Sequence, residues 1–155
     1  MSQPLPELTD ATLTLDNRVA TLTLDRHDVR NALTGTALVD DIVATAAWVN
    51  GCQEVSVLLI TGAGSAFLCR WKRKKTWPSA AAILRGDVAE VAERYRTGIQ
   101  RMPLALHKVE VPIIAAVNGA AIGAGFDLAN MADMRIASRK ASFGGDLSQS
   151  GDHSR

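Results

Sequence analysis

Residues 118–129, NGAAIGAGFDLA, are the segment of the 155-residue chain best suited to hold a negatively charged oxygen. Small residues allow the backbone to come close to a ligand, and a helix that begins here aims free backbone N–H groups at its N-terminal end. Asp127 falls in the first turn of that helix. Its carboxylate could move protons as a general acid or base, although the helix dipole alone also favours a carboxylate there.

Residues 61–67, TGAGSAF, form a second glycine-bearing segment directly after an apolar run. Gly62 and Gly64 are arranged as at the start of a dinucleotide-binding turn. The third glycine of that motif is replaced by Phe67, and no acidic residue follows about 20 residues later at the end of a second strand. A turn at a strand end is therefore the favoured interpretation, and nucleotide binding is the alternative.

A third segment, residues 26–33, reads RHDVRNAL and is expected to be a polar loop between a strand and a helix. Its charged side chains could contact phosphates: Arg26, His27, Asp28 and Arg30. A loop of mixed charge is more often simply solvated. His107 and His153 have no acidic or hydroxyl partner at a recognisable spacing, so we assign them no role.

The strands expected to position these segments follow from the apolar pattern. Alternating residues predict a β-hairpin with strands at 11–15 and 19–24. Continuous apolar runs at 55–61 and 111–119 are typical of strands buried on both faces, and residues 134–138 also favour a strand.

Three helices are expected between these strands. The first is capped by Thr34 or Thr36 and runs to about Asn50, with Gly51 as its stop. The second begins near Asp87 and continues until Pro103 kinks or ends it. The third covers about residues 125–132, and the alternation of strands and helices predicts an α/β fold.

Composition fits one globular domain: 47% of residues are hydrophobic, 21% are charged, and the mean hydropathy is +0.06. No apolar run reaches the roughly 18 residues needed to span a bilayer, and the N-terminal residues lack a signal-peptide pattern. Cys52 and Cys69 have no spacing typical of a disulfide framework or a zinc site. We therefore expect a cytoplasmic protein without a membrane or metal partner.

Charge is distributed unevenly along the chain. Residues 69–85, CRWKRKKTWPSAAAILR, contain six of the 17 Lys and Arg and none of the 16 Asp and Glu. The other 138 residues therefore hold 11 Lys and Arg against 16 Asp and Glu, a net charge of −5. Such a basic segment could bind nucleic acid or an acidic lipid surface, or it could be foreign sequence.

Taken together, these segments resemble the crotonase superfamily, which comprises the enoyl-CoA hydratases and isomerases. The resemblance covers residues 10–68 and 86–144 and rests on RNAL, VSVLLITGAGSAF and VPIIAAVNGAAIGAGFDLANMADMRIAS, in that order. It implies an α/β fold that is a spiral of ββα turns, usually assembled as a homotrimer. It also implies an acyl-CoA substrate and no other cofactor, coenzyme A being part of the substrate.

The resemblance further implies roles for individual residues. The thioester oxygen would accept hydrogen bonds from two backbone N–H groups, which is how an enolate-like oxygen is stabilised as it forms. Hydratases of the family usually have Glu where this chain has Asp127, whereas some double-bond isomerases have Asp. The implied residues are Cys69 and Ala124 for the oxyanion hole, Asp127 for catalysis, and Asp28, Arg30, Ala32 and Gly123 for coenzyme A.

Two segments depart from the family pattern, residues 69–85 and 145–155. Where relatives have a small, glycine-rich turn, this chain has Arg70, Trp71 and Lys72. Translating plausible codons for both segments in shifted frames gives family-like text, so we interpret them as frame-shifted; a real basic insert and a real short C-terminus are the alternatives.

As written, the chain is expected to be one partial domain, residues 1–155. It would lack roughly a hundred C-terminal residues and be inactive or impaired. The alternative function is a basic adaptor that binds nucleic acid or acidic lipid through residues 70–75. Otherwise, no nucleic-acid partner is expected.

Overall fold

The computed structural model describes residues 3–69 and 86–145. The expected irregular conformation of residues 69–85 therefore lies outside the described residues except at Cys69. The basic segment 70–75 and nearly all of residues 145–155 lie outside them as well.

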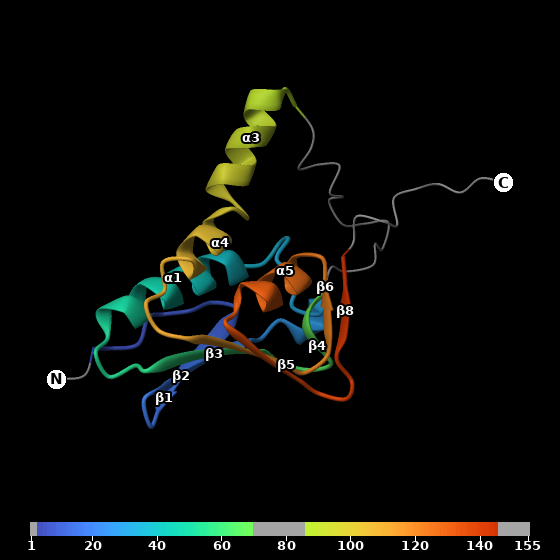
Figure 1. Ribbon diagram of the computed structural model, residues 1–155. Helices are drawn as coiled ribbons and strands as arrows, with labels where there is room; N and C mark the ends of the chain where they lie inside the picture. The colour runs from blue at the N-terminus through green and yellow to red at the C-terminus, as the bar shows by residue number, and fades with distance from the viewer. Residues whose placement is uncertain (1–2, 70–85, 146–155) are drawn as a thin grey trace.

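The described strands form two sheets (Figure 1). The larger sheet has the order β1-β2-β3-β5-β7, antiparallel between β1 and β2 and parallel elsewhere. Its strands are β1 Ala11–Asp16, β2 Val19–Leu24, β3 Val57–Gly62, β5 Ile113–Val117 and β7 Met134–Ala137. The smaller sheet is parallel throughout and contains β4 Ala66–Cys69, β6 Ala120–Ile122 and β8 Ser142–Gly144.

The chain alternates between the two sheets. In each of the pairs β3/β4, β5/β6 and β7/β8 the first strand joins the larger sheet and the second joins the smaller one. Helices follow the initial hairpin and the pairs β3/β4 and β5/β6: α1 Leu38–Gly51, α3 Val88–Thr97, α4 Arg101–Leu106 and α5 Ala124–Met131. This order repeats a ββα unit and confirms the predicted α/β class.

Several predicted elements are confirmed. The hairpin turn places Asn17 and Arg18 at φ 46° and 69°, as a two-residue turn of the type that matches strand twist requires. The third predicted strand is β3, which lies between two parallel partners. Its burial differs from the expectation, because Leu58 and Ile60 are buried while the alternate residues are only half-buried.

The single helix predicted from Asp87 to Pro103 is wrong, because the structure has two helices there, α3 and α4. Asp87 caps α3, and its carboxylate accepts the Glu90 N–H at 2.9 Å. The helix then breaks at Gly98 (φ −106°, ψ −115°). Pro103 lies in the first turn of α4, where its missing N–H has no intrahelical acceptor to lose.

The start of α1 also differs from the prediction. Ala37 is the N-cap, and its backbone N–H donates to the Asp10 carboxylate at 2.6 Å. The Asp10 carboxylate, just before β1, thus holds the N–H of the N-cap, while the hydroxyl of Thr36, one residue before the N-cap, accepts the Leu38 N–H at 3.4 Å. The smaller sheet was not predicted, because β6 occupies part of the expected glycine-rich turn and its strands contain only three or four residues.

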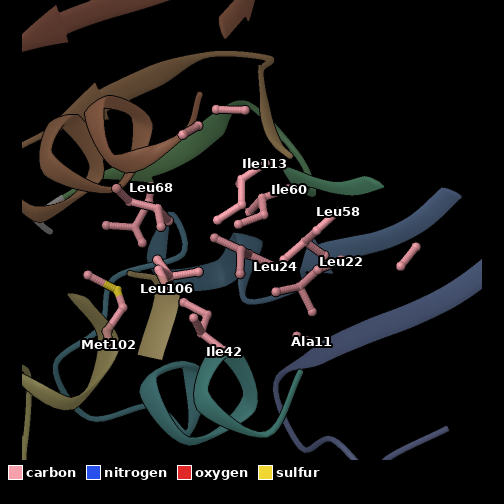
Figure 2. Packing of buried hydrophobic residues seen from close by; sticks show 14 of the residues in the cluster. Ala11, Leu22, Leu24, Ile42, Leu58, Ile60, Leu68, Met102, Leu106 and Ile113 are labelled. Atoms are coloured by element: carbon pink, nitrogen blue, oxygen red, sulfur yellow. The ribbon is translucent and has the colours of Figure 1, made fainter. Parts of the chain in front are cut away.

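The apolar core lies between the larger sheet and the helices α1 and α4 (Figure 2). Leu22, Leu24, Leu58 and Ile60 come from adjacent strands and are essentially inaccessible to solvent. They pack with buried residues of both helices and of β4, namely Ile42, Met102, Leu106 and Leu68. Within residues 3–69 and 86–145 no helix is long and apolar enough to cross a membrane.

Candidate functional site

Three loops converge at the carboxyl ends of the parallel strands β2, β3 and β5. Leu24 pairs with Gly62, and Thr61 pairs with Ala116, so the loops that follow these strands leave the same edge of the sheet. Ligand sites in parallel α/β sheets typically form outside this edge. All three segments singled out by sequence therefore meet in space.

The loop after β2 is held in a tight conformation. Arg30 and Asn31 have φ values of 56° and 57°, and the Arg30 N–H donates to the His27 carbonyl at 3.1 Å. Ala32 is buried, and its carbonyl accepts the Thr36 hydroxyl at 2.8 Å. Within the described residues the Arg30 Nε is buried and has no hydrogen-bond partner, so the described part of the protein does not use this donor of the guanidinium.

Arg26 is fully engaged with carboxylates. Its Nε and Nη2 donate to the two oxygens of Asp28 at 2.9 Å each, and its Nη1 lies 3.3 Å from an Asp10 oxygen. The hydrogen bond from Arg26 holds the pKa of the exposed Asp28 carboxyl below its usual value and raises the Arg26 pKa. Within the described part of the chain, the Arg26 guanidinium is thus held by two carboxylates, whereas the Arg30 Nε has no such partner.

Cys69 ends β4 beside the same loop. It is buried, and its backbone N–H donates to the Arg30 carbonyl at 3.1 Å. The residue expected to supply one oxyanion donor is thereby joined directly to a residue expected to contact coenzyme A.

The first turn of α5 carries the other expected residues. Gly123 precedes the helix, donates its N–H to the Gly144 carbonyl at 2.9 Å, and accepts the Asp127 N–H at 3.1 Å. Ala124 is the first helical residue, so its N–H has no acceptor within the helix. Asp127 lies three residues further and is exposed, on the same helix face as Ala124.

The helix α5 packs directly on β4. A Cβ added to Gly125 would overlap the backbone carbonyl of Leu68, so only glycine allows this approach. Leu68 precedes Cys69, and Ala124 precedes Gly125. The contact therefore sets side by side the two backbone segments that carry the expected oxyanion donors.

Two buried or half-buried amide side chains, Asn31 and Asn118, were not recognised as site residues from sequence. Asn31 is fully buried, and its Nδ2 lies 3.0 to 3.2 Å from the carbonyls of Ala63, Ala66 and Phe67. Asn118 directly follows β5, and its Oδ1 accepts the Gly62 N–H at 3.2 Å. An Asn immediately after a buried strand was the available signal.

The nucleotide-binding alternative for residues 61–67 does not fit the structure. The turn leads into the strand β4 and not into a helix, so it lacks the helix N-terminus that such a motif places at the phosphates. Among residues 3–69 and 86–145, no group of three or more His, Cys, Asp or Glu is arranged to hold a metal ion.

Comparison with known proteins matches residues 14–152 to the family described as enoyl-CoA hydratase/isomerase. A relative from Mycobacterium tuberculosis named "Probable enoyl-CoA hydratase EchA14" is 33% identical over 91% of this chain and 52% of its own length. The (E)-benzylidenesuccinyl-CoA hydratase of Thauera aromatica is 35% identical over 86% and 48%.

A solved structure of an enoyl-CoA hydratase subunit I from Geobacillus kaustophilus superposes with a TM-score of 0.72 at 28% identity, covering 90% of this chain and 50% of that one. The fold is therefore the crotonase fold over about half of its length. The chain likewise spans about half the length of the curated relatives it matches.

Proposed function

Because the chain belongs to the enoyl-CoA hydratase/isomerase family, we propose that it binds an acyl-CoA and stabilises an enolate-like oxygen on its thioester. The observation that carries this proposal is the packing of Gly125 against the Leu68 carbonyl. It brings the first turn of α5 next to the end of β4. Each of these segments contributes one backbone N–H, from Ala124 and Cys69, to the proposed oxyanion hole.

In this proposal the thioester oxygen accepts hydrogen bonds from both N–H groups while negative charge develops on it. In hydration, a water oxygen adds to the β carbon and a proton adds to the α carbon; in isomerisation, a proton leaves one carbon and another arrives two carbons away. The exposed Asp127 carboxylate is the proposed group that moves these protons. Because some isomerases of the family have Asp at this position and hydratases usually have Glu, we keep both isomerisation and hydration in the proposal.

The loop after β2 is the proposed contact for coenzyme A. The Nε of Arg30, which has no partner among the described residues, supports a phosphate contact there, and Asp28, Ala32 and Gly123 are the other residues that we propose to contact coenzyme A. Asp28 contributes through Arg26, because its carboxylate is already held by that guanidinium.

Turnover by this chain is proposed to be low. The Cys69 N–H is held by the Arg30 carbonyl at 3.1 Å, so a thioester oxygen has to displace that carbonyl before it can use this donor. The cytoplasm is the compartment we propose, and a trimer remains the assembly implied by the family.

Equilibrium titration with crotonyl-CoA, compared with free coenzyme A, tests the proposal. Ala124→Pro removes one proposed donor at the first helical position, where proline is well tolerated. Val88→Pro is the matched control, because Val88 is the first residue of α3, away from this site.

We expect the unsubstituted chain and Val88→Pro to bind crotonyl-CoA more tightly than coenzyme A, and Ala124→Pro to lose that preference. Circular dichroism verifies that both variants are folded. Absence of binding by the unsubstituted chain, or an unchanged preference in Ala124→Pro, refutes the proposal.

A further inference from the structure

The segment from Gly62 to Phe67, which joins β3 to β4, is held by hydrogen bonds to two asparagine side chains. Asn31 donates to the carbonyls of Ala63, Ala66 and Phe67. Asn118 accepts the Gly62 N–H at 3.2 Å and donates to the carbonyls of Gly64 at 3.1 Å and Ala66 at 3.4 Å. Two amides from distant parts of the chain therefore bond four of the six carbonyls of this short connection, and one of its N–H groups.

The fit around Asn31 is close. A Cβ on Gly62 would overlap the Ala66 carbonyl and lie 2.9 Å from the Asn31 Nδ2. On its other side, the Asn31 Oδ1 accepts the Arg26 N–H at 2.8 Å. Because both ends of this fully buried amide are bonded, its orientation is fixed.

Asn31 also acts together with its neighbour on the open edge of β4. β4 is an outer strand of the smaller sheet, paired on one side with β6. Along the other side, the Asn31 Nδ2 bonds the Phe67 carbonyl at 3.2 Å, and the Arg30 carbonyl accepts the Cys69 N–H at 3.1 Å. Residues 30 and 31 thus occupy two consecutive bonding positions, as a neighbouring strand would.

We propose that Asn31 and Asn118 are positioning residues of the oxyanion hole: they fix the connection from β3 to β4 and thereby the place of the Cys69 N–H. This inference rests on the proposed function for its catalytic meaning. The two side chains touch backbone and not substrate, so their effect passes through β4. Neither position was assigned a role by the family resemblance stated above.

The first experiment uses the protein without ligand. Asn118→Asp keeps the acceptor for the Gly62 N–H but replaces the donor that faces the Gly64 and Ala66 carbonyls. Asn31→Asp likewise keeps the acceptor for the Arg26 N–H but replaces the donor to three carbonyls of the connection. Asn50→Ala is the matched control, because Asn50 also bridges backbone groups, the Lys108 carbonyl at 2.6 Å and the Glu110 N–H at 3.0 Å.

Amide hydrogen exchange at Cys69 is the readout, with the Leu58 amide of β3 as the internal reference. We expect both Asp variants to exchange the Cys69 amide about tenfold faster relative to Leu58, and Asn50→Ala to leave the ratio unchanged. An unchanged ratio in Asn118→Asp overturns the proposal. Since Asn118 is only half-buried, that variant decides the question even if Asn31→Asp does not fold.

The second experiment uses butyryl-CoA carrying ¹³C at the thioester carbonyl. Binding in the oxyanion hole should lower the carbonyl stretching frequency. We expect Asn118→Asp to bind this probe within about threefold of the unsubstituted chain while the band moves back toward that of the free thioester.

A full shift retained in Asn118→Asp contradicts the positioning role. If the unsubstituted chain does not bind butyryl-CoA, the proposed function fails, whereas the exchange ratio still decides whether the asparagines hold the Cys69 amide.

Discussion

The backbone N–H of Cys69 donates to the carbonyl of Arg30 at 3.1 Å. One partner ends β4, and the other lies in a left-handed conformation in the loop after β2. This bond joins the proposed oxyanion donor to the proposed coenzyme A loop. A ligand that moves the loop therefore alters the donor, and several consequences of this arrangement can be measured.

Arg30→Gly should separate stability from ligand binding. At φ 56° a residue with a side chain incurs a cost of about 1–2 kcal/mol that glycine avoids. Glycine in turn loses more backbone entropy on folding, so the free energy of unfolding should rise by about 1 kcal/mol or less. Loss of the guanidinium should weaken coenzyme A binding about tenfold. Urea unfolding and titration measure the two effects.

The matched control for that substitution is Arg18→Gly. Arg18 also has positive φ, at 69°, but lies in the turn between β1 and β2. Coenzyme A binding should not change in this variant. Equal weakening by both substitutions would argue against a contact of Arg30 with the ligand.

Gly125→Ala should destabilise the fold. The added methyl group would overlap the Leu68 carbonyl, which belongs to the backbone of β4 and cannot rotate away. We expect a loss of about 1–3 kcal/mol in the free energy of unfolding, as for other overpacked positions. Gly145→Ala is the control, since no atom lies within 4 Å of a Cβ there; similar losses in both would show that α5 does not pack on β4 this closely.

Asp28→Asn should lower stability at neutral pH and have no such effect in acid. The Asp28 carboxyl has its pKa lowered by the hydrogen bond from Arg26. A lowered folded-state pKa contributes stability above the unfolded value of about 3.9, and this contribution is lost as pH falls through the folded value.

The effect should be small because Asp28 is exposed. Urea midpoints at neutral pH and near pH 2 measure it, with Glu54→Gln as a control for removal of one exposed carboxylate. A difference between Asp28→Asn and the unsubstituted chain that persists undiminished in acid would contradict the assigned cause.

The 155-residue chain should turn over crotonyl-CoA slowly or not at all, as measured by the absorbance of the conjugated thioester. A version with the reading frames restored in residues 69–85 and from residue 145 onward, and therefore with the C-terminal part of the family present, should be active. In that version Asp127→Asn should lower kcat by about 10²–10⁴ and leave acyl-CoA binding largely intact. Rapid turnover by the chain as written would show that the Arg30 carbonyl does not impede the Cys69 donor.

Resequencing the coding DNA provides an independent check on the interpretation of these two segments. Finding the same frames throughout would favour a real insert and a real C-terminal segment. The activity comparison between the two versions would then describe an engineered repair and not a natural form.

Local sequence determined the elements that are stabilised by residues close to one another in the chain. The β1–β2 hairpin follows from alternation and from turn residues that accept positive φ, and α3 begins where Asp87 caps Glu90. The apolar run of β3 identified a strand at the centre of the larger sheet. The family resemblance, resting on these motifs, also indicated the fold, which the described residues confirm.

Tertiary structure alone decided how the site is held. The motif RNAL indicates a loop position for Asn31, yet the side chain is fully buried. It bonds carbonyls that lie 32 to 36 positions away in the sequence, so no local pattern could show this burial. The Cys69 N–H finds its acceptor at Arg30, and the strands of the smaller sheet are too short to show a period. Backbone hydrogen bonds between distant segments leave no mark in local composition, because any residue supplies the N–H and the carbonyl.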